Sequence, residues 1–132
     1  MNRDSTLKES ERLLREERFQ EALKLLRVYL VRYDGDAVAH ALTGAALSAT
    51  EQYALAAREY RHSLAVNGDQ PEVGKSLLDC LMKLRRWQEA RELADELYRA
   101  NPADRILVVM RESCHENAPL PAIGWEVDTS QD

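Results

Sequence analysis

Residues 18–30 read RFQEALKLLRVYL, residues 52–64 read QYALAAREYRHSL and residues 86–98 read RWQEARELADELY. In each stretch an aromatic residue is followed three places later by an alanine, and both recur every 34 residues. A period of about 20 to 50 residues is typical of solenoids, in which each unit buries its apolar face against its neighbours. The sequence therefore predicts one structural unit written three times.

The three units align without a gap as residues 3–36, 37–70 and 71–104, and Leu13, Leu47 and Leu81 also share one place in the unit. Apolar residues at helical spacing predict a pair of helices in each unit, and the short loops between them make neighbouring helices antiparallel. The expected helices span residues 4–16, 19–32, 37–49, 53–66, 71–84 and 87–100, with a seventh helix over 104–116.

The turn residues predict where these helices begin and end. Gly35 is expected to take a left-handed conformation after the second helix, where glycine carries no steric penalty. Asp36 and Asp104 are expected to accept hydrogen bonds from the free amides at the start of the next helix. Pro71 suits the first turn of a helix, since its missing N–H is not needed there.

These features resemble the tetratricopeptide repeat, whose 34-residue unit has a small residue in its first helix and an aromatic residue and alanine early in its second. The resemblance covers residues 3 to about 116 and is closest in the second unit, through Gly44, Leu47, Tyr53, Ala56 and Tyr60. It implies an all-α fold, a right-handed α-α superhelix (TPR solenoid) of seven helices with an irregular C-terminal tail. A repeat domain over 1–117, with a capping helix at 104–116, would precede an extended or disordered tail at 118–132.

Two units depart from the family pattern. The first has Thr6 and Glu9 where the family usually places large apolar residues. The third has Gly74, and then Leu78 where the family prefers a small side chain. We expect the packing of these two units to differ from that of the second.

Composition and charge exclude several classes of function. The net charge of −5 and the small basic cluster of Lys83, Arg85 and Arg86 do not provide the basic surface that nucleic-acid binding needs. No apolar stretch is long enough to span a membrane, and the charged residues near the start, Arg3 and Asp4 among them, do not fit a secretory signal. We expect a cytoplasmic protein that binds neither nucleic acid nor membrane.

The cysteines and histidines give no pattern typical of an enzyme or a metal site. Cys80 and Cys114 stand at equivalent places 34 residues apart, and neighbouring helices about 8 to 10 Å apart are too distant for a disulfide, so both are expected to be small core residues. His115 follows Cys114 directly, and adjacent helical residues point in different directions and cannot act as nucleophile and base. The sequence predicts no catalysis, no metal and no cofactor.

The family resemblance also implies that the first helix of each unit lines a concave groove. Such a groove would bind a peptide through apolar anchors, with charges at its rim setting the peptide's orientation. For Val38, Leu42 and Met110 the alternative is an ordinary place in the core between units. The predicted groove residues are Leu7, Glu11, Val38, Ala41, Leu42, Ala45, Lys75, Asp79, Met82, Val109 and Met110.

One function known in the family can be tested against the residues. Family members that act as cochaperones hold the terminal carboxylates of chaperones with Lys, Asn and Arg side chains. The matching places here are Leu7, Glu11, Leu42, Glu72 and Ser76, none of which can hold a carboxylate. The chain is therefore predicted not to bind acidic chaperone tails.

The seventh helix and the tail raise the possibility of self-association. Residues 106–110 read ILVVM, which places apolar side chains around most of the helix and requires a cover on its outer side. Ile123, Trp125 and Val127 would all point the same way in an extended segment, so the tail either docks on a groove or the seventh helix, or stays disordered. A second copy of the chain, in a homodimer, would cover the helix equally well.

The leading hypothesis is a noncatalytic protein–protein interaction module, an adaptor or scaffold that holds a segment of a protein partner in its concave face. A small TPR chaperone of a bacterial secretion system and a self-association domain of a larger protein are the alternatives. A dedicated chaperone would co-purify with one unstable client, whereas self-association would appear in light scattering at several concentrations.

Overall fold

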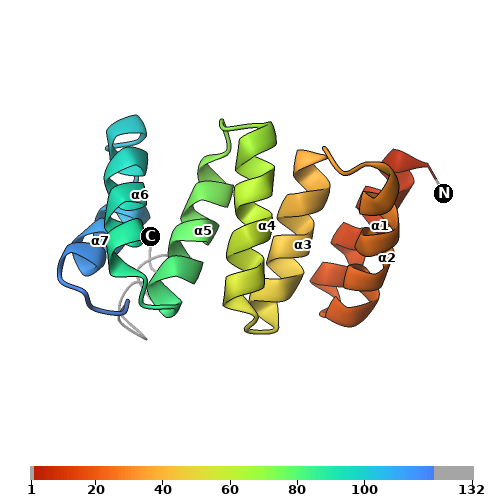
Figure 1. The fold of residues 1–132 in the computed structure, drawn as a ribbon, viewed down its shortest axis with the longest axis horizontal. Coiled ribbons are helices and arrows are strands. Elements are labelled where there is room, and N and C mark those ends of the chain that lie inside the picture. Colours follow the sequence, from red (N-terminus) through yellow and green to blue (C-terminus); the bar gives the residue numbers. More distant parts are fainter. Residues whose placement is uncertain (1, 121–132) are drawn as a thin grey trace.

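A computed structural model describes residues 2–120, and within this range the chain forms seven α-helices and no strand. Each helix expected from the sequence is present, with both ends within one residue of the prediction. Figure 1 shows the helices side by side along the long axis, with α1 and α2 at one end and α6 and α7 at the other. The helices are α1 (Arg3–Arg15), α2 (Phe19–Arg32), α3 (Ala37–Ala49), α4 (Tyr53–Val66), α5 (Pro71–Lys83), α6 (Trp87–Ala100) and α7 (Arg105–His115).

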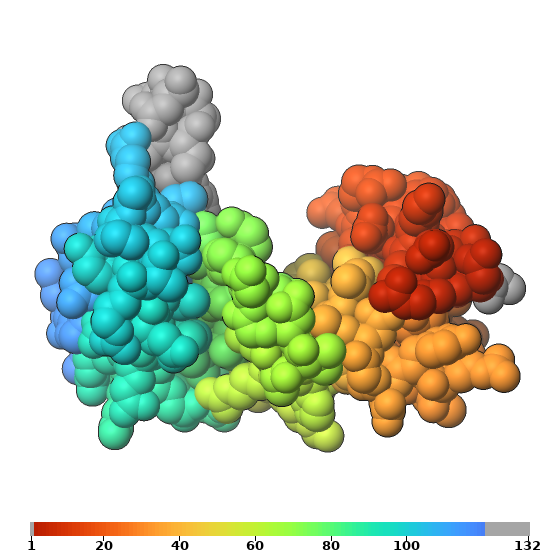
Figure 2. All heavy atoms as spheres, turned by 90° about the horizontal axis from the view of Figure 1, so that it is seen from above, coloured from red at the N-terminus to blue at the C-terminus, as the bar shows by residue number. Residues whose placement is uncertain are grey.

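The helices pack as a stack of antiparallel hairpins. Each helix contacts the next one in sequence, and α1 also contacts α3 as α5 contacts α7. The first helices of the units therefore form one layer and the second helices form the other. Seen from above in Figure 2, the surface is hollowed between the red first hairpin and the green α4–α5 region.

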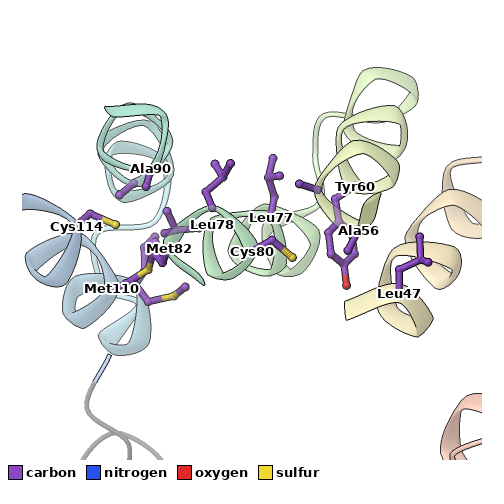
Figure 3. Close-up of a cluster of buried hydrophobic side chains, with 14 of the residues drawn as sticks. Leu47, Ala56, Tyr60, Leu77, Leu78, Cys80, Met82, Ala90, Met110 and Cys114 are labelled. Atoms are coloured by element: carbon purple, nitrogen blue, oxygen red, sulfur yellow. The ribbon is translucent and has the colours of Figure 1, made fainter. Parts of the chain in front are cut away.

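The residues that define the period form the centre of each unit. Ala22, Ala56 and Ala90 are fully buried, and their small side chains allow two helices to approach closely. The leucines that precede them by nine residues are at most 6% exposed. Figure 3 shows part of the larger core cluster, with side chains from α3 to α7 meeting along one continuous interior.

The second and third units place large and small residues differently. In the second unit, Gly44 lies under the Tyr60 ring, so that an added Cβ would lie 2.7 Å from Tyr60 Cε1. The counterparts of these two residues in the third unit, Leu78 and Ala94, are both fully buried and have the opposite sizes. There, Gly74 makes the close approach instead, with Leu97 Cδ2 2.7 Å from an added Cβ. The departure seen in the sequence is thus compensated by an exchange of volumes between the two helices of the hairpin.

Of the two departures in the first unit, Glu9 is half-buried and pairs with Arg12, and Thr6 lies in the core beside a second buried hydroxyl, that of Ser10. Thr6 and Ser10 are buried at 6% and 0% exposure, which places hydroxyl groups in the core. Thr6 Oγ1 donates to the carbonyl of Asn2 at 2.8 Å, and Ser10 Oγ donates to the carbonyl of Thr6 at 2.9 Å. These bonds satisfy polar groups whose burial without a partner would be costly.

The first helix of every unit ends in the same left-handed turn. Glu17, Glu51 and Arg85 have φ of 58°, 62° and 58°, and the N–H of the following residue donates to a carbonyl five residues back, as Gln52 does to Leu47 at 2.8 Å. This pairing is the Schellman motif. Helix α7 ends in the same way, with Asn117 at φ 53° and the Ala118 N–H donating to the Ser113 carbonyl at 2.9 Å.

The prediction for Gly35 is wrong, and those for the aspartate caps are confirmed. No glycine among residues 2–120 has a positive φ, because the left-handed turns lie after the first helix of each unit and Gly35 follows a second helix. Asp36 Oδ1 accepts from the amides of Val38 and Ala39 at 3.0 and 3.1 Å. Asp104 Oδ1 accepts from the amide of Leu107 at 3.1 Å, and Pro71 begins α5.

Candidate functional site

A hollow of about 420 Å³ opens between α3, α4, α5 and α7. Helix α5 supplies most of its wall, and the other three helices supply one or two residues each. Because α3, α5 and α7 are the first helices of successive units, the hollow lies on the face that the repeat pattern assigns to the groove. It is lined by Ser48, Tyr60, Glu72, Lys75, Ser76, Asp79, Lys83, Ile106 and Met110.

Charges of alternating sign run along α5 beside the hollow. Lys75 Nζ lies 3.1 Å from Glu72 Oε1, and Lys83 Nζ lies 3.2 Å from Asp79 Oδ2. Helical residues three and four places apart are neighbours, which explains both pairs. The hollow therefore has two carboxylates and two ammonium groups and no excess of either sign.

Lys75 also fixes the position of α7 relative to α5. Its Nζ lies 2.7 Å from Asp104 Oδ2, and Asp104 caps the first turn of α7. The hydrogen bond from Lys75 lowers the pKa of Asp104, and the same bond raises the pKa of Lys75. The Lys75 side chain is only 15% exposed, and this pair links the two walls of the hollow.

Tyr60 brings a phenol group to the floor of the hollow. Its side chain is 5% exposed, and burial raises the pKa of the hydroxyl to about 12, although a hydrogen bond with Ser76 acts in the opposite direction. In Figure 3 the sulfur of Cys80 on α5 points toward the Tyr60 side of the cluster. The floor thus offers a neutral hydroxyl that stays protonated throughout the physiological range.

The α7 side of the hollow is apolar. Ile106 is half-buried against the core cluster, and Met110 is 3% exposed, with only its edge reaching the hollow. Figure 3 shows Met110 close to Met82, in the space between α7 and α5. A bound segment would meet charged groups on α5 and an apolar, adaptable surface on α7.

The predicted groove residues are divided among several places. Lys75, Asp79 and Met110 line the hollow. Leu7 packs with α2 and α3 in the smaller core cluster and Met82 lies in the larger one, at 7% and 4% exposure, which corrects their expected position on an open wall. The remaining ones lie outside the hollow: Glu11 is exposed, Ala41, Leu42, Ala45 and Val109 are half-buried, and Val38, at 41% exposure, borders a separate hollow beside Tyr33 and Val66.

Six lining residues are absent from the predicted groove residues: Ser48, Tyr60, Glu72, Ser76, Lys83 and Ile106. Two of them, Tyr60 and Lys83, lie outside the places that the repeat assigns to the groove. Tyr60 stands at a core position of the repeat. Its ring packs over Gly44, and the small size of that residue is the sequence signal that the ring can extend past α3 to the groove side. Lys83 follows Asp79 by four residues, which already indicates an ion pair on one helix face. The predicted docking residues Ile123, Trp125 and Val127 lie outside the described residues.

His40 and His115 form hydrogen bonds within the fold, and both cysteines are buried in the core. His40 Nε2 lies 2.6 Å from the Asp34 carbonyl oxygen, and His115 Nε2 lies 2.8 Å from Asp95 Oδ1. Cys80 and Cys114 are free and fully buried, and burial raises the pKa of Cys114 to about 11 and also raises that of Cys80. Both thiols are therefore protonated at neutral pH, which disfavours nucleophilic chemistry.

Comparison with solved structures gives a match over most of the chain. The structure of a protein described as "MamA RS-1 ArsTM double mutant" superimposes with a TM-score of 0.80 and 19% sequence identity, covering 86% of this chain and 64% of that one. The fold is that of a TPR-type helical solenoid. The chain spans about two thirds of the length of that protein, and an identity of 19% extends the likeness to the fold alone.

Neither a family model nor a curated protein matches the chain. In the part of the chain that the structure describes, no helix combines the length and apolar character needed to cross a membrane. No group of three or more potential metal ligands occurs within the same residues.

Proposed function

We propose that the chain is a noncatalytic protein-interaction module, an adaptor or scaffold, that binds a peptide segment of a partner protein in the hollow between α3, α5 and α7. The observation that carries this proposal is the hollow itself, which combines an apolar wall, a neutral hydroxyl and balanced charges on one face of the solenoid. Helical repeats of this type generally bind proteins through such faces.

The chemistry of the lining favours a peptide over a small charged metabolite. A phosphate or carboxylate ligand would need an excess of cations, and here each lysine is already paired with a carboxylate. A peptide of mixed character gains affinity by covering the half-buried Ile106, while its own charged groups take the place of partners in the ion pairs on α5. We propose that this peptide binding takes place in the cytoplasm.

Selection of binding peptides with the purified chain, from a random displayed library, tests the proposal. Selected peptides are then titrated calorimetrically against the wild-type chain and against two groove variants, Ser76→Arg and Lys83→Glu. The first variant fills the hollow and the second reverses one of its charges, so each should weaken binding at least tenfold. Ala54→Glu, an exposed position on α4 outside the hollow, is the matched control.

Two results would count against the proposal. Selected peptides that bind the groove variants as tightly as the wild type would place the site elsewhere on the solenoid. A library that yields no binding sequence at micromolar affinity would remove the support for a peptide ligand. Circular dichroism of each variant shows whether the fold is retained.

A further inference from the structure

A second hollow lies on the opposite layer, between α2 and α4, and has a different character. It has a volume of about 400 Å³ and an apolar surface with two arginines at its edge. Two of its apolar residues are strongly exposed, Val31 at 87% and Leu55 at 47%. We call this surface the α2–α4 groove; it is lined by Leu23, Arg27, Leu30, Val31, Thr43, Leu47, Leu55, Arg58 and Glu59.

The repeat provides an internal comparison for the α2–α4 groove. One unit further along, between α4 and α6, Arg61 forms an ion pair with Glu89 that bridges the two helices. Arg27 is the counterpart of Arg61, but the counterpart of Glu89 is Leu55. At these positions of the repeat, an ion pair therefore closes the groove between α4 and α6. In the α2–α4 groove the exposed Leu55 replaces the glutamate, and the groove stays open.

The cations at this groove have no acidic partner of their own. Within residues 2–120, no carboxylate pairs with Arg27 or Arg58, and the one acid of the lining, Glu59, lies 3.4 Å from His40 Nδ1. The counterpart of Arg58 in the third unit is Glu92, so the second arginine of this groove is not repeated one unit further along. Two copies facing each other through this surface would bring four arginines together, which excludes a symmetric pairing. The groove fits a segment that carries both apolar and acidic side chains.

The chain itself contains a segment with this chemistry. Residues 121–132 read PAIGWEVDTSQD, in which Ile123, Trp125 and Val127 alternate with other residues and three carboxylates occur without a lysine or arginine. In an extended strand the three apolar side chains would point to one side, where they match Leu30, Val31 and Leu55. Glu126 and Asp128 would point to the other side, where they would meet the arginines at the edge only through the long side chains that extend beside the segment.

The segment of the same molecule cannot reach this groove. The Ala118 N–H bonds the Ser113 carbonyl at 2.9 Å, so the chain leaves from the end of α7. From Leu120 to Trp125 an extended chain covers at most about 18 Å. Two helix spacings separate α7 from α4, through α5, and at about 8 to 10 Å each they amount to about 16 to 20 Å. The groove lies on the far side of α4, toward α2, so Trp125 of the same molecule falls short of it.

We propose that the α2–α4 groove binds residues 121–132 of a second copy of this chain. The contact joins two different surfaces, so it adds copies head to tail and grows into an open chain or a closed ring. It leaves the hollow between α3, α5 and α7 free, and its success or failure is therefore independent of the function proposed above.

A complementation experiment on the full chain tests this pairing. Analytical ultracentrifugation of the wild type should show a mass that rises above the monomer with concentration. Leu55→Glu and Trp125→Ala should each weaken association at least tenfold. The first places a charge in the apolar groove, and the second removes the largest apolar side chain of the bound segment. Arg58→Glu is a second groove variant, and Ala54→Glu, one residue from Leu55 and outside the groove, is the matched control that should associate like the wild type.

Mixing the two defective variants gives the decisive result. Leu55→Glu retains an intact segment and Trp125→Ala an intact groove, so an equimolar mixture should form a complex of two chains and nothing larger. A wild type that stays monomeric up to hundreds of micromolar overturns the proposal. So does a mixture that fails to associate, or a Leu55→Glu variant that associates as strongly as the wild type.

Discussion

Gly44→Ala offers a quantitative test of how the second unit is packed. An alanine Cβ would lie 2.7 Å from Tyr60 Cε1 and 2.8 Å from Cδ1, well inside van der Waals contact. The Tyr60 ring is 5% exposed and cannot rotate away, so α3 and α4 must separate or the ring must leave its rotamer. Overpacking of this kind costs about 1 to 3 kcal/mol. Alanine returns about 1 kcal/mol of helix propensity, which leaves an expected loss of about 0 to 2 kcal/mol.

Gly74→Ala is the matched control for this prediction. Its Cβ would meet only the tip of Leu97, at 2.7 Å, and this half-buried side chain can change rotamer at low cost. We expect Gly74→Ala to be neutral or to gain up to about 1 kcal/mol from helix propensity. Urea unfolding followed by circular dichroism gives both values, and a Tyr60→Leu background should turn the Gly44→Ala loss into a gain. Equal stabilities for the two alanine variants would refute the packing argument.

Three further predictions concern the turns and the buried groups. Burial raises the pKa of Asp36, but hydrogen bonds from Tyr29 Oη and the Ala39 amide and the charge of Arg3 stabilise the carboxylate, so that the pKa is lowered overall. The contribution of Asp36 to stability is therefore present above about pH 4 and is lost as the pH falls below that value. Asp36→Asn should accordingly flatten the fall in the urea midpoint between pH 5 and pH 2. Glu51, at φ 62°, should tolerate glycine with a change of about 0 to 1 kcal/mol in favour of folding, whereas valine there should cost at least about 1 kcal/mol, as thermal unfolding would report. Both cysteines should resist a thiol reagent at pH 8 in the native chain and react at once in urea, and rapid native labelling would contradict their burial.

The helices could be predicted closely because their signals are local. The 34-residue period, the alanine in each second helix and the aspartate caps depend on a few neighbouring residues, and the helix ends agree within one residue. The left-handed turns were missed because the hairpin geometry requires φ > 0 there whatever the residue is, so Glu17 adopts it while Gly35 does not. Residue type alone does not reveal such a position.

The candidate site was predicted less fully because it depends on distances between helices. Lys75 and Asp79 were expected from their places on α5 and do line the hollow. Leu7 and Met82 share the helix face of groove residues, yet neighbouring helices cover them. Gly74 departs from the family pattern because Leu97 of α6 fills the space beside it, a contact between helices that the sequence does not show.

The turn after α7 has a consequence for engineering. Since α7 ends in the same left-handed turn as α1, α3 and α5, the backbone at Ala118 already follows the path along which each earlier first helix continues into a second one. Grafting a helix such as residues 87–100 directly after this turn should lengthen the array by another hairpin without redesign of the junction. The turn after α7 is therefore a connector suited to building longer arrays.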